Sequence, residues 1–197
     1  MTSRQLSVPQ GGPHRMRTMK AYLFQKLLFV GLAATVLMLP MPLGAQSSED
    51  VCIVRATIEP GIVTGLIAWI VTKTKWVAQQ PPSICSVSHR QLLKIYDSDG
   101  SAPNDLQIHA LYSIRNHNVY LVENWNPTDL HDRAALLHEL VHHLQQLNNV
   151  KAPCLAANEP QAYHLEIEWV REQGIEDPYK FLDIDEFTIS LLSQCQD

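Results

Sequence analysis

The stretch LLHELVHHLQ, residues 136–145, limits what this chain can fold into more than any other part of the sequence. It contains His138, Glu139 and His142 in the order H-E-x-x-H. On an α-helix, residues four apart lie on the same face, so both histidines can present an imidazole nitrogen to one metal ion. Glu139 can then reach a water molecule at that ion and act as its general base. The motif predicts a helix that carries a zinc site.

The sequence around the motif predicts one long amphipathic helix over residues 129–148, with Thr128 as its N-cap. Its apolar face is turned away from the two histidines and is buried, as a site that excludes water requires. A histidine-rich core helix that binds no metal is the competing interpretation. The apolar positions recur every three or four residues and are Leu130, Ala134, Leu137, Val141, Leu144 and Leu147.

A third metal ligand has to come from outside this helix. A catalytic zinc ion usually has three protein ligands and one open position. The extended pattern H-E-x-x-H-x-x-G-x-x-H is absent from the sequence, which has no glycine or third histidine at that spacing. The preferred candidate is Glu159, which begins a second predicted helix over residues 158–173. The alternatives are Glu166, otherwise a solvated carboxylate, and the histidines His143 and His164.

Two neighbours of the candidate ligands qualify this interpretation. Pro160 follows Glu159, and the residue before a proline is biased away from helical backbone. We therefore expect Glu159 at the edge of the second helix rather than within it. His143 points about 100° around the helix from His142. We interpret His143 as a residue behind the ligands or at the surface.

The stretch HELVHHLQ followed by E-x-x-A-Y resembles the glutamate-zincins, zinc metallopeptidases whose third ligand is a glutamate on the helix after the motif helix. The stretches AWIVTKTKW, PPSICSVS, LLHELVHHLQ and CLAANEPQAY are also similar to a family of exported bacterial proteins of that type. This resemblance implies a small zincin-like domain, Glu159 as the ligand, and Ala162 as the small residue that lets the two helices approach. It further implies that the strand VYLV, residues 119–122, is the edge strand that holds an extended substrate, although as a strand it is equally well explained as part of the core.

Periodicity predicts an α+β domain around the motif. Two alternating apolar runs, residues 106–114 and 119–125, predict an antiparallel hairpin. The remaining predicted elements are a helix over 61–76, a strand over 83–88, a short helix capped by Ser88, a loop over 96–105 and a last helix within 184–195.

Residues 1–45 differ from the rest of the chain. They contain five basic residues and no acidic one, and then the apolar run LLFVGLAATVLMLP. This pattern predicts a signal peptide, cleaved after Ala45. A retained membrane anchor is the alternative, but two prolines interrupt the run, which is shorter than the roughly 20 residues of a spanning helix. We therefore expect residues 46–197 to form a single exported domain, periplasmic or secreted, that meets a membrane only through an uncleaved signal segment.

The charge balance excludes one class of partner. After residue 45 the chain has 10 basic and 20 acidic residues, and a formal net charge of −10. Nothing in this part resembles the basic surface of a nucleic-acid-binding protein. We expect a peptide or protein substrate and no nucleic-acid partner, while the oligomeric state stays open.

The four cysteines, Cys52, Cys85, Cys154 and Cys195, all follow the predicted signal peptide. An even number of cysteines in an exported chain favours disulfides over a metal site, and no C-x-x-C spacing occurs. Four cysteines allow three pairings. We expect Cys52 to pair with Cys85 and Cys154 with Cys195, because each bond then closes one half of the chain.

The reaction that these motifs predict is hydrolysis of a peptide bond. It needs a donor for the developing oxyanion, and Tyr163, His164 and Tyr179 are candidates, although each is also explained as a packing or surface residue. Two other functions remain open. One is a zinc-containing binding or scaffold protein without turnover, and the other is a zinc hydrolase that acts on an amide or ester of the cell envelope.

Overall fold

The computed structural model describes residues 52, 56, 58–96 and 107–195. These residues all belong to one unit, residues 46–197. The predicted signal peptide and nearly all of the predicted loop 96–105 lie outside the described residues. No helix among the described residues is long and apolar enough to cross a membrane.

A three-stranded sheet forms the β part of the domain. Its strands are β1 (Ser83–Val87), β2 (Ala110–Ser113) and β3 (Asn118–Val122), in the order β1-β3-β2. The predicted hairpin is confirmed, because β2 pairs antiparallel to β3, while β1 pairs parallel to β3. The strand VYLV therefore lies in the centre of the sheet, and the prediction that it is the edge strand is wrong. The two edge positions belong to β1 and β2.

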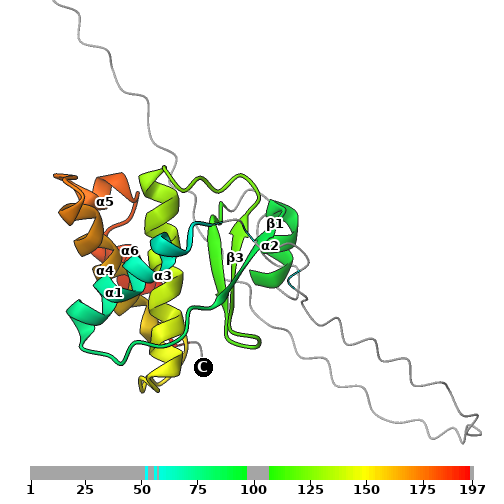
Figure 1. Ribbon diagram of the computed structural model, residues 1–197. Coiled ribbons are helices and arrows are strands. Elements are labelled where there is room, and N and C mark those ends of the chain that lie inside the picture. Colours follow the sequence, from blue (N-terminus) through cyan, green and yellow to red (C-terminus); the bar gives the residue numbers. More distant parts are fainter. Residues whose placement is uncertain (1–51, 53–55, 57, 97–106, 196–197) are drawn as a thin grey trace, which may run out of the picture. The chain divides into compact units, whose positions relative to one another are not determined.

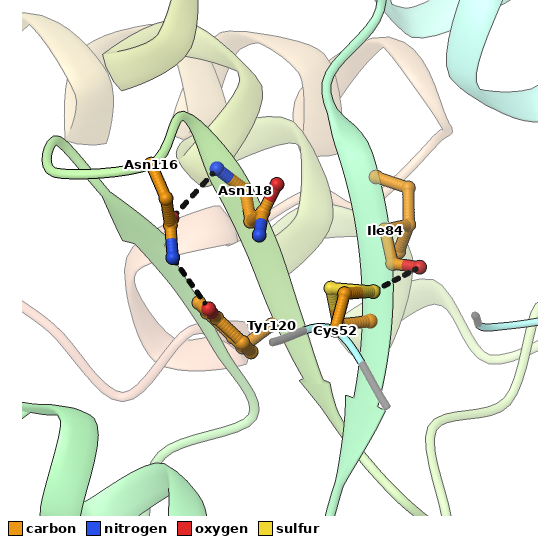
Figure 2. Close-up of a disulfide and its surroundings, with 6 residues drawn as sticks. Cys52, Ile84, Asn116, Asn118 and Tyr120 are labelled. Atoms are coloured by element: carbon orange, nitrogen blue, oxygen red, sulfur yellow. Dashed lines mark hydrogen bonds between the residues drawn. A yellow bond between two sulfur atoms is a disulfide. The ribbon is translucent and has the colours of Figure 1, made fainter. Parts of the chain in front are cut away.

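Figure 2 shows contacts of the sheet at the hairpin turn between β2 and β3 and at β1. In the hairpin turn, His117 has a positive φ of 57° and its N–H donates to the carbonyl of Ser113 at 2.8 Å. The side chain of Asn116 bridges this turn, accepting from the N–H of Asn118 and donating to the hydroxyl of Tyr120. On the other side, Cys52 lies beside Ile84 of β1. The turn thus sets the register of β2 against β3.

Helices pack around one central helix, α3 (Leu130–Leu147), which lies between the sheet and the helices α1 (Pro60–Thr74) and α4 (Glu159–Glu172), as Figure 1 shows. The predicted α+β class is therefore confirmed, as are the long helix and the second helix. The other helical segments are α2 (His89–Tyr96), η1 (Ala156–Asn158), α5 (Pro178–Phe181) and α6 (Glu186–Leu192). Neither η1 nor α5 was predicted from the sequence.

The apolar face of α3 forms the middle of the core. Leu137, Leu140, Val141 and Leu144 are fully buried, against side chains of α1, β3 and α4. Burying a side chain of this size contributes about 1.5–3 kcal/mol each. Ala162 of α4 is fully buried as well, at the close contact of α4 with α3. This packing fixes which side of α3 is left for the histidines.

The residue that caps α3 differs from the prediction. The side chain of Asp129 accepts hydrogen bonds from the N–H groups of His131 and Asp132, at 2.8 and 3.1 Å. Thr128 instead donates its hydroxyl to the side chain of Asn126 at 2.8 Å. Both residue types can cap a helix, and α3 begins one residue later than expected, which brings the aspartate into the capping position.

Both predicted disulfides, Cys52–Cys85 and Cys154–Cys195, are present. The first joins the segment before α1 to β1, and the second joins the loop before α4 to the segment after α6. Ser88 also caps α2 as predicted, because its hydroxyl accepts from the N–H of Gln91 while the Gln91 side chain accepts from the N–H of Ser88.

Candidate metal centre

Two histidines of α3 and one glutamate of α4 meet at a single point. The Nε2 atoms of His138 and His142 are 3.1 Å apart, and Glu159 places its carboxylate oxygens 3.2 Å from the first and 3.4 Å from the second. One ligand atom from each residue lies within 4.8 Å of the others. Structure and sequence thus bring the same three residues together, and this group could bind a metal ion.

The other ring nitrogen of each histidine is already engaged. His138 Nδ1 lies 3.0 Å from a carboxylate oxygen of Glu166, and His142 Nδ1 lies 2.9 Å from Gln145 Oε1. The orientation of the Gln145 amide follows from its Nε2, which donates to the carbonyl of Asn158 at 3.1 Å. Because both acceptors require a hydrogen on Nδ1, the two Nε2 atoms are left as lone-pair donors.

When both histidines are neutral, three electron-pair donors therefore face one another without a hydrogen between them. Two imidazole nitrogens and a carboxylate converge on one point, and a positive charge there, either a proton on His138 or a metal ion, stabilises this arrangement. Metal-bound histidines almost always donate their second N–H to a carboxylate, carbonyl or similar acceptor, as His138 and His142 do here. A set of two histidines and one glutamate fits zinc, with a fourth position left open.

Charges in the site shift the pKa values of His138 and Glu159. Burial would lower the pKa of His138, but its contacts with Glu159 and Glu166 raise it well above the ordinary value. Burial would raise the pKa of Glu159, but the contacts with His138 and His142 lower it to about 2. The cluster thus favours an ionised carboxylate and a positive charge beside it.

Glu159 reaches the site from the first residue of α4. Its backbone is helical, with φ −57° and ψ −45°, so it lies at the helix edge as predicted, but the expected departure from helical backbone before Pro160 does not occur. Pro160 falls in the first turn, where a missing N–H breaks no helical hydrogen bond. Gln145 ties this turn to α3, through Asn158 and the side chain of Gln161.

Glu166 is not the solvated carboxylate that the sequence allowed, because it is buried beneath His138. It contacts Nδ1, on the side of the ring away from Nε2, so it is not placed as a ligand. Its seven-residue spacing from Glu159 puts both carboxylates on one face of α4, two turns apart. That spacing is the sequence pattern from which its position beside His138 could have been inferred.

Glu139 is not one of the three converging residues, but it lines the same groove and contacts the sheet. Its Oε2 accepts a hydrogen bond from the backbone N–H of Tyr112 in β2, at 2.7 Å. Burial raises the pKa of the Glu139 carboxyl, while His138, His142 and the Tyr112 N–H oppose this shift. The contact with the backbone of the edge strand could not be seen in the sequence.

His143 takes no part in the cluster, and its alternative placement at the surface is wrong. It is 3% exposed, its Nε2 donates to the carbonyl of Gln80 at 2.9 Å, and its ring meets the edge of Tyr112. Burial lowers the pKa of His143. This histidine is a buried structural residue of the core side of α3.

The ligand cluster opens into a groove of about 660 Å³, with α3 as its floor and β2 and α4 as its walls. Of the three candidate oxyanion donors, Tyr163 lines this groove, and its ring packs 4.5 Å from that of His138. His164 and Tyr179 are not among the lining residues and both contact Glu186. Burial raises the pKa of Tyr163, so its hydroxyl keeps its proton.

A comparison with protein-family models gives one match. Residues 55–197 match the family described as "Domain of unknown function (DUF6647)". The chain belongs to the DUF6647 family. The match includes α1, the sheet and the whole ligand cluster, so these are parts of the DUF6647 domain. No curated protein and no solved structure matches the chain significantly.

Proposed function

We propose that this DUF6647 protein is a zinc-dependent hydrolase that cleaves peptide bonds. The observation that carries the proposal is the convergence of His138 Nε2, His142 Nε2 and the Glu159 carboxylate, with both Nδ1 atoms engaged by outer partners. The two disulfides fit an exported protein. We further propose that the protein works in the periplasm or outside the cell, on peptide or protein substrates.

The chain's own residues have separable roles in this reaction. Zinc in a site of this kind supplies Lewis-acid activation of water and polarisation of a carbonyl group. Glu139 is the general base, which takes a proton from the attacking water and later gives it to the leaving amine. The Tyr112 N–H orients this carboxylate. Burial raises the pKa of Glu139, which makes its carboxylate a stronger base toward the attacking water.

Tyr163 is the candidate donor for the oxyanion. It is the one of the three predicted donors that lines the groove, and its protonated hydroxyl suits hydrogen-bond donation. Glu166 positions His138 rather than touching substrate. Peptide bonds are preferred as substrate because of the resemblance to glutamate-zincins and because the groove follows the edge strand β2.

The test combines metal content and activity. Purified wild-type protein and Glu139→Gln are loaded with zinc, their zinc content is measured by mass spectrometry, and both are incubated with a broad peptide library. We expect one zinc per chain in both proteins, and hydrolysis by Glu139→Gln that is about 10²- to 10⁴-fold slower. Wild-type protein that holds zinc and cleaves no peptide contradicts the proposal. In that case a panel of amide and ester substrates separates an envelope hydrolase from a binding protein.

A further inference from the structure

The groove extends to both sides of the ligand cluster. Seven residues of α3 line it as one stripe: His131, Ala135, His138, Glu139, His142, Gln145 and Gln146. His131 and Gln146 are fifteen positions apart, which corresponds to about 22 Å along the helix axis. An extended chain of about seven residues spans this distance. The ligands His138 and His142 lie near the middle of the stripe rather than at one end.

The wall formed by β2 runs along the groove for about the same length as the stripe on α3. Residues 107–112 and Ile114, in and around β2, also line the groove. His109, just before β2, donates its Nδ1 hydrogen to Asp132 near the start of α3. Tyr112, three residues later, contacts Glu139 in the middle of α3. Strand β2 therefore runs in the same direction as α3, and its edge stays beside the groove on both sides of the cluster.

Exposed apolar side chains lie at the end of the groove beyond His142. Leu155 and Leu192 line the groove and are 61% and 45% exposed. The Cys154–Cys195 disulfide holds their two segments together, since Leu155 follows Cys154 directly and Leu192 lies three residues before Cys195. Among the described residues, four of the seven exposed large hydrophobic side chains line this groove, so the exposed apolar surface concentrates there. The four are Tyr96, Ile114, Leu155 and Leu192.

We propose that the groove binds an internal segment of an extended polypeptide, with residues on both sides of the ligand cluster, and that Leu155 and Leu192 receive an apolar side chain of that segment. This inference rests on the proposed peptide hydrolysis and names its substrate. The protein then acts within chains rather than at their ends. Apolar contact area at one end of the groove sets the preferred residue at a fixed position relative to the cleaved bond.

Two sets of peptides test this mode of binding. The first consists of eight-residue peptides with acetylated N-termini, amidated C-termini and a fluorophore–quencher pair, in which a leucine or an aspartate is moved along the sequence. The second consists of dipeptides and tripeptides with free ends. Cleavage is measured with zinc-loaded wild-type protein, and affinity with zinc-loaded Glu139→Gln. We expect cleavage of the blocked peptides and a preference for leucine at one position relative to the cleaved bond.

Leu155→Asp is the informative variant and Phe187→Asp is its matched control. Phe187 is 76% exposed on α6 and does not line the groove, so both changes add the same charge at an exposed apolar position. We expect Leu155→Asp to raise KM for the leucine peptides by about tenfold, the lower end of the effect of a lost apolar contact in a binding pocket. Leu155→Met is expected to restore the wild-type value, and Phe187→Asp to leave it unchanged.

The possible outcomes separate this inference from the function on which it rests. Cleavage of free-ended peptides alone, or equal effects of Leu155→Asp and Phe187→Asp, overturns the inference and leaves the hydrolase intact. Binding of blocked peptides to Glu139→Gln without cleavage by the wild type supports the docking mode and contradicts the hydrolase. Neither binding nor cleavage of any peptide overturns both.

Discussion

The two walls of the groove, α4 and β2, make different kinds of contact with the residues of α3. The helical wall, α4, brings one carboxylate to each ring nitrogen of His138, Glu159 to Nε2 and Glu166 to Nδ1. The strand wall, β2, offers the backbone N–H of Tyr112 to Glu139. Helix α4 therefore contributes side chains to the ligand cluster, while strand β2 positions the proposed base, Glu139, through a backbone N–H group. Changes in the two walls should have separable effects on metal binding and on catalysis.

Each half of the domain also has its own disulfide. Cys154–Cys195 lies five residues before Glu159 and fixes the approach to the helical wall. Cys52–Cys85 joins the segment before α1 to β1, which is separated from β2 by β3. The first bond is close to the ligand cluster and the second is remote from the groove. Removing each disulfide in turn therefore tests whether the two halves of the domain affect the site differently, without any substitution in the ligand cluster.

The largest effect is expected from Glu159→Ala. It removes one of the three converging ligands, so we expect a loss of zinc affinity greater than the roughly 10- to 100-fold loss that follows removal of an outer partner. Isothermal titration of metal-free protein with zinc measures this loss. His164→Ala, at an exposed histidine of the same helix, is the control and should bind zinc as the wild type does. Unchanged affinity of Glu159→Ala would remove α4 from the metal site.

The disulfides should separate stability from metal binding. Replacing either pair by serines is expected to lower the free energy of unfolding by about 2–5 kcal/mol. Zinc affinity should fall in Cys154→Ser/Cys195→Ser, because the start of α4 is then less constrained, and stay unchanged in Cys52→Ser/Cys85→Ser. Urea denaturation and zinc titration of both double variants measure the two quantities. An equal loss of affinity in both would show that the two halves do not act independently on the site.

Glu166→Gln should weaken zinc binding by roughly 10- to 100-fold without abolishing it. The amide keeps the shape of the side chain and can still accept from His138 Nδ1, but it removes the negative charge that favours a cation nearby. The titration used for Glu159→Ala measures this effect. Glu168→Gln, at a surface glutamate paired with Lys73, is the matched control. A complete loss of metal in Glu166→Gln would instead assign Glu166 as a ligand.

The smallest effect concerns the start of α3, the floor that both walls share. Asp129→Ala removes the side chain that caps this helix and should cost about 1 kcal/mol of stability. Thr128→Ala, the position favoured by the sequence, should change stability by less than about 0.5 kcal/mol. Thermal or urea unfolding of the two variants compares them directly. Equal costs would mean that Thr128 shares the capping role.

What the sequence predicted well is what depends on local spacing. Helix α3, the pairing of His138 with His142, and the approach of Glu159 all follow from residue positions along one or two helices. The buried state of Glu166 and the backbone contact of Glu139 depend on which helix and strand pack there. Strand order is also non-local: the parallel pairing of β1 with β3 placed VYLV in the centre of the sheet. Alternation of apolar residues cannot distinguish a central strand from an edge strand of this kind.

The origin of the ligands on two helices has a consequence for the abundance of the protein. His138 and His142 belong to α3 and Glu159 to α4, so a metal ion bound by all three exists only while these helices are docked. Binding free energy then adds to folding free energy, by about 2.7 kcal/mol when free zinc is 100 times the dissociation constant. For the proposed zinc protein, scarcity of zinc would therefore lower the stability of the chain and expose it to unfolding and proteolysis.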